Sequence, residues 1–147
     1  MVRTNSRLYI DKDSRPMYSF IRKKSSLTLI NSQMFLIALS IGYYYGVKKP
    51  LTKKHAFINY ETAPIDLFSI IMLLAIDEYG EDIDKWINNP LDLFDLAEEY
   101  ANAGIEILMK EVESHHDFEL EEFLTPIIVK LYENVDFETK YNEFFSE

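Results

Sequence analysis

The chain has 147 residues, a length typical of one compact domain, and it has no cysteine, which excludes disulfide bonds, thiolate metal sites and a cysteine nucleophile. It is 48% hydrophobic and 14% aromatic, far above the composition of disordered chains. Residues 1–54 carry a formal charge of +9 and residues 55–147 carry −19, which together give the net −10. Such asymmetry indicates a charged partner or two surfaces with different duties.

The basic N-terminal part predicts a short strand and a short helix. Leu8-Tyr9-Ile10 alternates in a basic context, which favours a half-buried edge strand. Pro16 lies near the first helical position of a helix that runs to about Lys24, with Met17, Phe20 and Ile21 at helical spacing. A strand followed by two helices also fits a ribbon-helix-helix arrangement, although the second helix is more apolar than that arrangement favours.

An apolar run predicts a helix that is buried on most sides. Asn31-Ser32 precedes it, Met34 to Tyr45 is almost uninterrupted, and Gly46 is a natural C-terminal residue for it. The run has twelve residues, fewer than the roughly 20 that a membrane-spanning helix needs. Residues 47–54 follow as a basic loop.

The acidic part predicts three further helices. Thr62-Ala63-Pro64 opens one that ends by Tyr79-Gly80. Its apolar residues point in nearly every direction, so the helix must be buried in its own domain or in an interface. Two such central helices compete for cover in a small domain, which favours a homo-oligomer. Residues 82–87 predict one helical turn. Asn89-Pro90 starts a long amphipathic helix, and a last helix covers roughly 118–134 with a kink at Pro126. The apolar stripe of the amphipathic helix consists of Phe94, Ala97, Ala101, Ile105, Leu108 and Val112. Its polar residues fall mostly outside this stripe; they are Asp92, Asp95, Glu98, Glu99, Asn102, Glu106 and Glu113.

These patterns predict a mostly all-α fold: a single compact helical domain of five or six helices over residues 1–147, in which a short N-terminal strand is the one β element that the pattern allows. Residues 1–54 form its basic portion, 55–135 its acidic helical portion and 136–147 a loosely held tail. No apolar segment of a signal peptide follows the N-terminus, so we expect a cytoplasmic protein without a membrane partner.

Two segments carry a family resemblance. Residues 35–51 read FLIALSIGYYYGVKKPL, and residues 98–108 read EEYANAGIEIL. Together they resemble the Dnd-system-associated protein 4 family, small proteins encoded beside bacterial DNA phosphorothioation genes. The resemblance covers about residues 7–113 and departs from the family at Ala103; the tail from Ser114 onward lies outside it. It implies a role in DNA modification or phage defence and supplies no catalytic residues.

Two basic segments are candidates for nucleic-acid binding. We expect them to converge beside the end of the buried helix, where they would give salt-sensitive, sequence-independent affinity for phosphates. The alternative is that these side chains are solvated or pair with the acidic helices. The candidate residues are Arg22, Lys23, Lys24, Lys48, Lys49, Lys53 and Lys54.

No motif indicates catalysis. The only cluster of metal-ligand types is Glu111, His115, His116 and Asp117, which we interpret as an interhelical loop rather than a metal site. Paired carboxylates lie on amphipathic helix faces, where a solvated surface is the ordinary interpretation. His55, beside Lys54, is interpreted as a loop residue. We therefore predict no enzyme and no cofactor.

The sequence favours a non-catalytic accessory protein of a DNA phosphorothioation-linked phage-defence system. It would contact DNA through the basic portion and a protein partner through the acidic helices. The alternative is an acidic protein-interaction or inhibitory module that does not bind nucleic acid.

Overall fold

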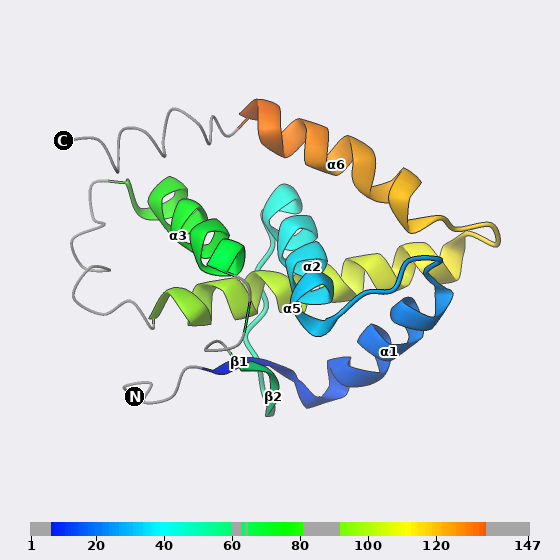
Figure 1. The fold of residues 1–147 in the computed structure, drawn as a ribbon, viewed down its shortest axis with the longest axis horizontal. Coiled ribbons are helices and arrows are strands. Elements are labelled where there is room, and N and C mark those ends of the chain that lie inside the picture. The colour runs from blue at the N-terminus through cyan, green and yellow to red at the C-terminus, as the bar shows by residue number, and fades with distance from the viewer. Residues whose placement is uncertain (1–6, 60–62, 64, 81–91, 135–147) are drawn as a thin grey trace.

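The structure, a computed structural model, describes residues 7–59, 63, 65–80 and 92–134. These ranges are mostly helical and contain a two-stranded sheet near the N-terminus, which confirms the predicted fold class (Figure 1). The elements in chain order are β1 (Arg7–Asp11), the 3-10 helix η1 (Lys12–Ser14), α1 (Arg15–Lys24), α2 (Asn31–Tyr45), β2 (Lys54–Asn59), α3 (Ile65–Tyr79), α5 (Asp92–Ser114) and α6 (Leu120–Asn134).

Helices α2 and α5 pack against each other at the centre of the molecule (Figure 1). Their backbones touch because glycine occupies both sides of the crossing. A Cβ atom at Gly42 would lie 1.9 Å from the carbonyl oxygen of Tyr100, and one at Gly104 would lie 1.8 Å from that of Ala38. These glycines belong to the two segments that carry the family resemblance, so that pattern is in large part the signature of this helix pair.

The predicted strand is confirmed, and its partner is a strand that the sequence did not predict. β1 pairs antiparallel with β2, from Arg7 opposite Asn59 to Asp11 opposite Lys54, with an irregularity between Leu8 and Tyr9. The prediction of a basic loop over 47–54 is therefore wrong at Lys54, which begins β2. Because β1 is already paired within its own chain, the structure does not have the ribbon-helix-helix arrangement, in which strands of two chains pair.

The helical predictions for the described residues agree closely with the structure. The buried helix spans Asn31–Tyr45 and ends at Gly46, whose φ of 66° is the left-handed conformation that glycine adopts easily. All six residues of the predicted stripe on α5 are buried. α6 continues through Pro126. The predicted turn over 82–87 and the tail over 136–147 lie outside the described residues.

Two polar residues were assigned to the wrong side of α5. Glu98 and Asn102 were predicted to lie mostly off the apolar stripe, but their exposed fractions are 2% and 4%. Both are buried because segments from elsewhere in the chain use them as hydrogen-bond partners. Among the described residues, no helix is both long enough and apolar enough to cross a membrane.

Candidate nucleic-acid interface

Three of the seven candidate residues are held by carboxylates of the acidic helices. The Lys48 ammonium lies 3.0 Å from Glu78 Oε1, and this hydrogen bond raises the pKa of Lys48 above its ordinary value. Lys49 pairs with Glu106, which likewise raises its pKa. Both lysines thus lie over helices α3 and α5, as the alternative interpretation of the basic loop anticipated.

Lys54 is the third paired residue. Its ammonium lies 3.6 Å from Asp95 Oδ1 and 3.9 Å from Glu98 Oε1, and 5.7 Å from the centre of the Tyr9 ring. Glu98 also accepts a hydrogen bond of 2.7 Å from the backbone N–H of Tyr9. A single buried carboxylate therefore joins β1 and β2 to α5.

A buried amide fixes the loop that carries Lys48 and Lys49. Asn102 donates to the carbonyl oxygens of Lys49 and Pro50 at 3.1 and 3.2 Å, and it accepts from the Ser14 hydroxyl at 3.1 Å. The backbone N–H of Lys49 donates to the carbonyl oxygen of Glu99 at 3.0 Å. The loop is thus bonded through its backbone to α5, which fixes where the Lys48 and Lys49 side chains begin.

A second buried carboxylate organises the end of the sheet. Asp11 accepts hydrogen bonds from the backbone N–H and the hydroxyl of Thr52, at 2.9 and 3.0 Å, and from the backbone N–H of Asp13 at 3.2 Å. The Thr52 N–H is the main cause that lowers the pKa of Asp11, so this group is charged at neutral pH. Beside it, the backbone N–H of Lys12 donates to the carbonyl oxygen of Lys53 at 2.7 Å.

Arg22 has a structural role. Its guanidinium group donates to the side chain of Asn31, the first residue of α2, and Asn31 in turn donates to the carbonyl oxygen of Phe57 at 3.0 Å. The Arg22 Nε atom is buried and has no hydrogen-bond partner. This side chain therefore ties α1 to the start of α2 and to β2 and does not face solvent freely.

The other three candidates, Lys23, Lys24 and Lys53, are exposed. Within the part of the chain that the structure describes, none of them forms an ion pair. The Lys24 ammonium lies 5.4 Å from the centre of the Phe20 ring. These are the candidates whose charge is available to an external anion.

The expected convergence of the two basic segments is wrong. Arg22 binds Asn31 at the first turn of α2, whereas the second segment follows Gly46 at the last turn of the same helix. Fifteen helical residues separate these ends, or about 22 Å at the rise of an α-helix. Arg22 therefore lies far from the lysines that directly follow Gly46, whereas Lys53, later in the second segment, lies beside Lys12 at the end of the sheet.

Two basic residues were missed by the sequence interpretation. Lys12 and Arg15 are exposed, and no ion pair within the described ranges involves them. Lys12 lies beside Lys53, because the backbone N–H of Lys12 donates to the carbonyl oxygen of Lys53. The signal in the sequence was the spacing of Arg15, Ser19 and Lys23, which repeats every four residues and marks one face of a helix.

Carboxylates gather where α5 ends and α6 begins, at a site that we call the acidic corner. Its members are Glu111, Glu113, Asp117, Glu119, Glu121 and Glu122. Among the described residues, Lys and Arg side chains form no ion pair with these groups. His115 Nδ1 lies 3.5 Å from Glu111 Oε2, and no group of three possible metal ligands occurs in the described part of the chain.

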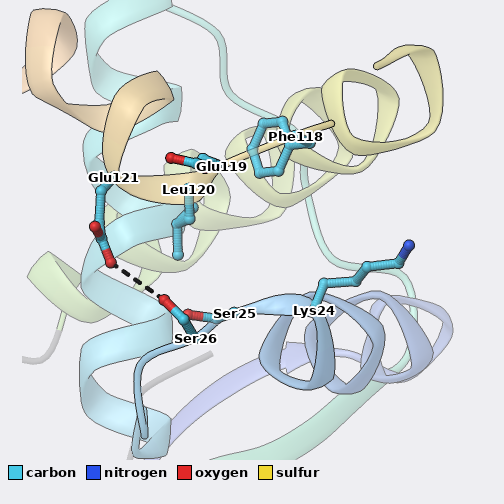
Figure 2. Close-up of a pocket in the computed structure, with 7 residues that line it drawn as sticks. All are labelled: Lys24, Ser25, Ser26, Phe118, Glu119, Leu120 and Glu121. Atoms are coloured by element: carbon cyan, nitrogen blue, oxygen red, sulfur yellow. Dashed lines mark hydrogen bonds between the residues drawn. The ribbon is translucent and has the colours of Figure 1, made fainter. Parts of the chain in front are cut away.

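A hollow of about 200 Å³ lies beside the acidic corner. Figure 2 shows it between two segments. One is the end of α1 with the residues that follow it, Lys24, Ser25 and Ser26, and the other is residues 118–121, which lead into α6. The Ser26 hydroxyl and Glu121 Oε1 approach to 3.5 Å across it. The basic end of α1 and the acidic corner thus adjoin here.

The comparisons with known proteins identify no relative. No family model, no curated protein and no solved structure matches this chain.

Proposed function

We propose that this chain is a non-catalytic accessory protein that binds nucleic acid through its basic N-terminal portion and a protein partner through its acidic helices. Its place in a DNA phosphorothioation-linked phage-defence system is part of the proposal and rests on the resemblance of residues 35–51 and 98–108 to the Dnd-system-associated protein 4 family.

One observation carries the proposal: most of the exposed charges that have no ion pair are grouped by sign. Five such cations of the described residues lie on η1, on α1 and at the end of the sheet, and two more, Lys110 and Lys130, lie on α5 and α6. The carboxylates of the acidic corner gather where α5 meets α6, where, among the described residues, only Glu111 lies near a basic side chain, that of His115. Complementary charge speeds association with partners of opposite sign and orients them. Segregation therefore supports two different partners, one anionic and one cationic.

A second candidate is an acidic interaction module that does not bind nucleic acid. It is favoured by the pairing of Lys48, Lys49 and Lys54 with carboxylates of the same chain, which removes three of the seven candidate cations. The net charge of −10 also opposes the approach of a polyanion.

One experiment separates the two candidates. Binding of the full chain to ordinary and phosphorothioated duplex DNA is measured from about 50 to 200 mM salt, where phosphate contacts lose much of their affinity. The proposal predicts binding that weakens as salt rises, and tighter binding to the modified duplex would support the defence setting. An absence of binding at the lowest salt would favour the acidic module.

A further inference from the structure

We infer that the nucleic-acid contact surface is the exposed face of α1 together with the end of the sheet, and not the lysine-rich loop. This inference rests on the proposed function and names the residues that perform its DNA contact. We call the surface the basic stripe, and it consists of Lys12, Arg15, Lys23, Lys24 and Lys53.

The sequence of α1 divides into a buried and a charged face. Tyr18 and Ile21 are each 2% exposed and anchor the helix on the core. The helix contains four cations and no carboxylate, and all but Arg22 of these cations are exposed. α1 is therefore an amphipathic helix whose outer face is positive and already fixed in place.

The cations of the basic stripe differ from the loop lysines in their partners. Lys48, Lys49 and Lys54 each have a carboxylate of the same chain within ion-pair distance. No ion pair within the described ranges involves a member of the stripe. Solvent ions therefore neutralise the stripe, and phosphates that replace those ions gain the entropy of their release.

Two exposed lysines leave the backbone next to each other at the end of the sheet. The N–H of Lys12, the first residue of η1, donates to the carbonyl oxygen of Lys53, beside the last strand pair, Asp11 and Lys54. The buried Asp11 holds this segment by its bonds to Thr52 and Asp13, so the backbone that carries both lysines is fixed in place.

The spacing along α1 suits a duplex. Arg15 and Lys23 are eight residues apart, or about 12 Å along the helix axis, and about 12 Å is also the width of the DNA major groove. Cations at both ends of the exposed face can therefore reach the phosphates that border one groove. The basic stripe contains five cations, and the exposed carboxylate on η1 and α1 is that of Asp13. The partner is the DNA phosphate backbone, read without base specificity.

The test compares three double variants of the full chain on one duplex DNA across a salt series. Lys23→Glu/Lys24→Glu alters the stripe, and Lys48→Glu/Lys49→Glu alters the loop. Lys110→Glu/Lys130→Glu makes the same change in net charge at two exposed lysines of α5 and α6. Circular dichroism checks that each variant is folded, and Lys23→Gln/Lys24→Gln repeats the test with a smaller change in charge.

We expect the stripe variant to bind at least about tenfold more weakly, with the slope of log affinity against log salt reduced by about 2, for two lost phosphate contacts. The Lys110/Lys130 variant should change affinity less than about threefold. An equal loss in both would mean that only net charge matters and would overturn the inference.

Other outcomes separate this inference from the function on which it rests. Wild-type binding that is lost only in the loop variant would overturn the basic stripe and leave DNA binding intact. No wild-type binding at about 50 mM salt would overturn both. Binding to phosphatidylserine vesicles but not to DNA would show that the stripe serves a membrane surface, which also contradicts the inference.

Discussion

Gly104 lies against the carbonyl oxygen of Ala38 with no room for a side chain between α5 and α2. A Cβ atom at Gly104 would lie 1.8 Å from that oxygen and 2.8 Å from the backbone nitrogen of Gly42. Both neighbours are backbone atoms of a central helix, so neither can rotate away. We expect Gly104→Ala to lower the free energy of unfolding by at least about 3 kcal/mol, at the upper end of overpacking effects. Urea unfolding followed by circular dichroism measures it.

Gly46→Ala is the control for backbone conformation. Gly46 has a φ of 66° but no atom within 4 Å of an added Cβ. This variant should lose only about 1 kcal/mol, the cost of a left-handed conformation for a residue with a side chain. If both variants lost the same stability, close approach of the two helices would not be the reason that position 104 requires glycine.

The hydroxyl of Tyr18 is buried without a hydrogen-bond partner, and this burial raises its pKa. Its ring packs 4.8 Å from that of Phe57, centre to centre. We expect Tyr18→Phe to leave stability unchanged or to raise it by up to about 1 kcal/mol, because a buried polar group without a partner is itself destabilising.

Tyr100→Phe is the matched substitution. The Tyr100 hydroxyl donates to Glu78 Oε1 at 3.2 Å, so its removal should lower stability by about 1 kcal/mol. Thermal unfolding of both variants measures the difference. A clear loss in Tyr18→Phe would mean that its hydroxyl does have a partner in solution.

The charge of Asp11 should make the free energy of unfolding depend on pH in the acidic range. Its pKa is lowered in the folded state, so its contribution is fully present above the unfolded pKa of about 3.9 and is lost as pH falls through the folded pKa. We expect Asp11→Asn to be less stable than the wild type by about 2 kcal/mol at pH 7, with the gap narrowing below pH of about 4.

Asp13→Asn is the control for this effect. Asp13 is exposed and contributes only its backbone N–H to the bonds of Asp11. Its substitution should change stability by less than about 0.5 kcal/mol at every pH. Urea unfolding at a series of pH values tests both, and a gap for Asp11→Asn that stays constant down to pH of about 2 would contradict the assignment.

Asn102 should determine how firmly the basic loop is held. Asn102→Ala removes the donors to Lys49 and Pro50 and the acceptor of Ser14. We expect a loss of about 1–3 kcal/mol and faster amide exchange at Lys49, whose N–H bonds to α5 next to this contact. Ser14→Ala removes one of the three bonds and should have a smaller effect; equal exchange rates in wild type and Asn102→Ala would contradict this role.

Local sequence patterns were enough to predict the helices of the described residues. The buried run that ends at Gly46 and the stripe from Phe94 to Val112 were predicted nearly to the residue, since helix periodicity and helix ends depend on neighbours within a few positions. The asymmetry of charge is likewise a property of the sequence alone. Both follow from local information.

Which charged side chains are buried or paired depends instead on how the helices pack. Glu98 was assigned to the acidic surface, yet it is buried and binds the N–H of Tyr9, 89 positions away. Lys49 forms an ion pair with Glu106, which is 57 positions away in the sequence. Strand β2 was missed for the same reason, since its partner β1 lies far away in the sequence. Hydrogen bonds and ion pairs of this kind form between segments that approach only when the helices pack, so spacing along the chain carries no signal for them.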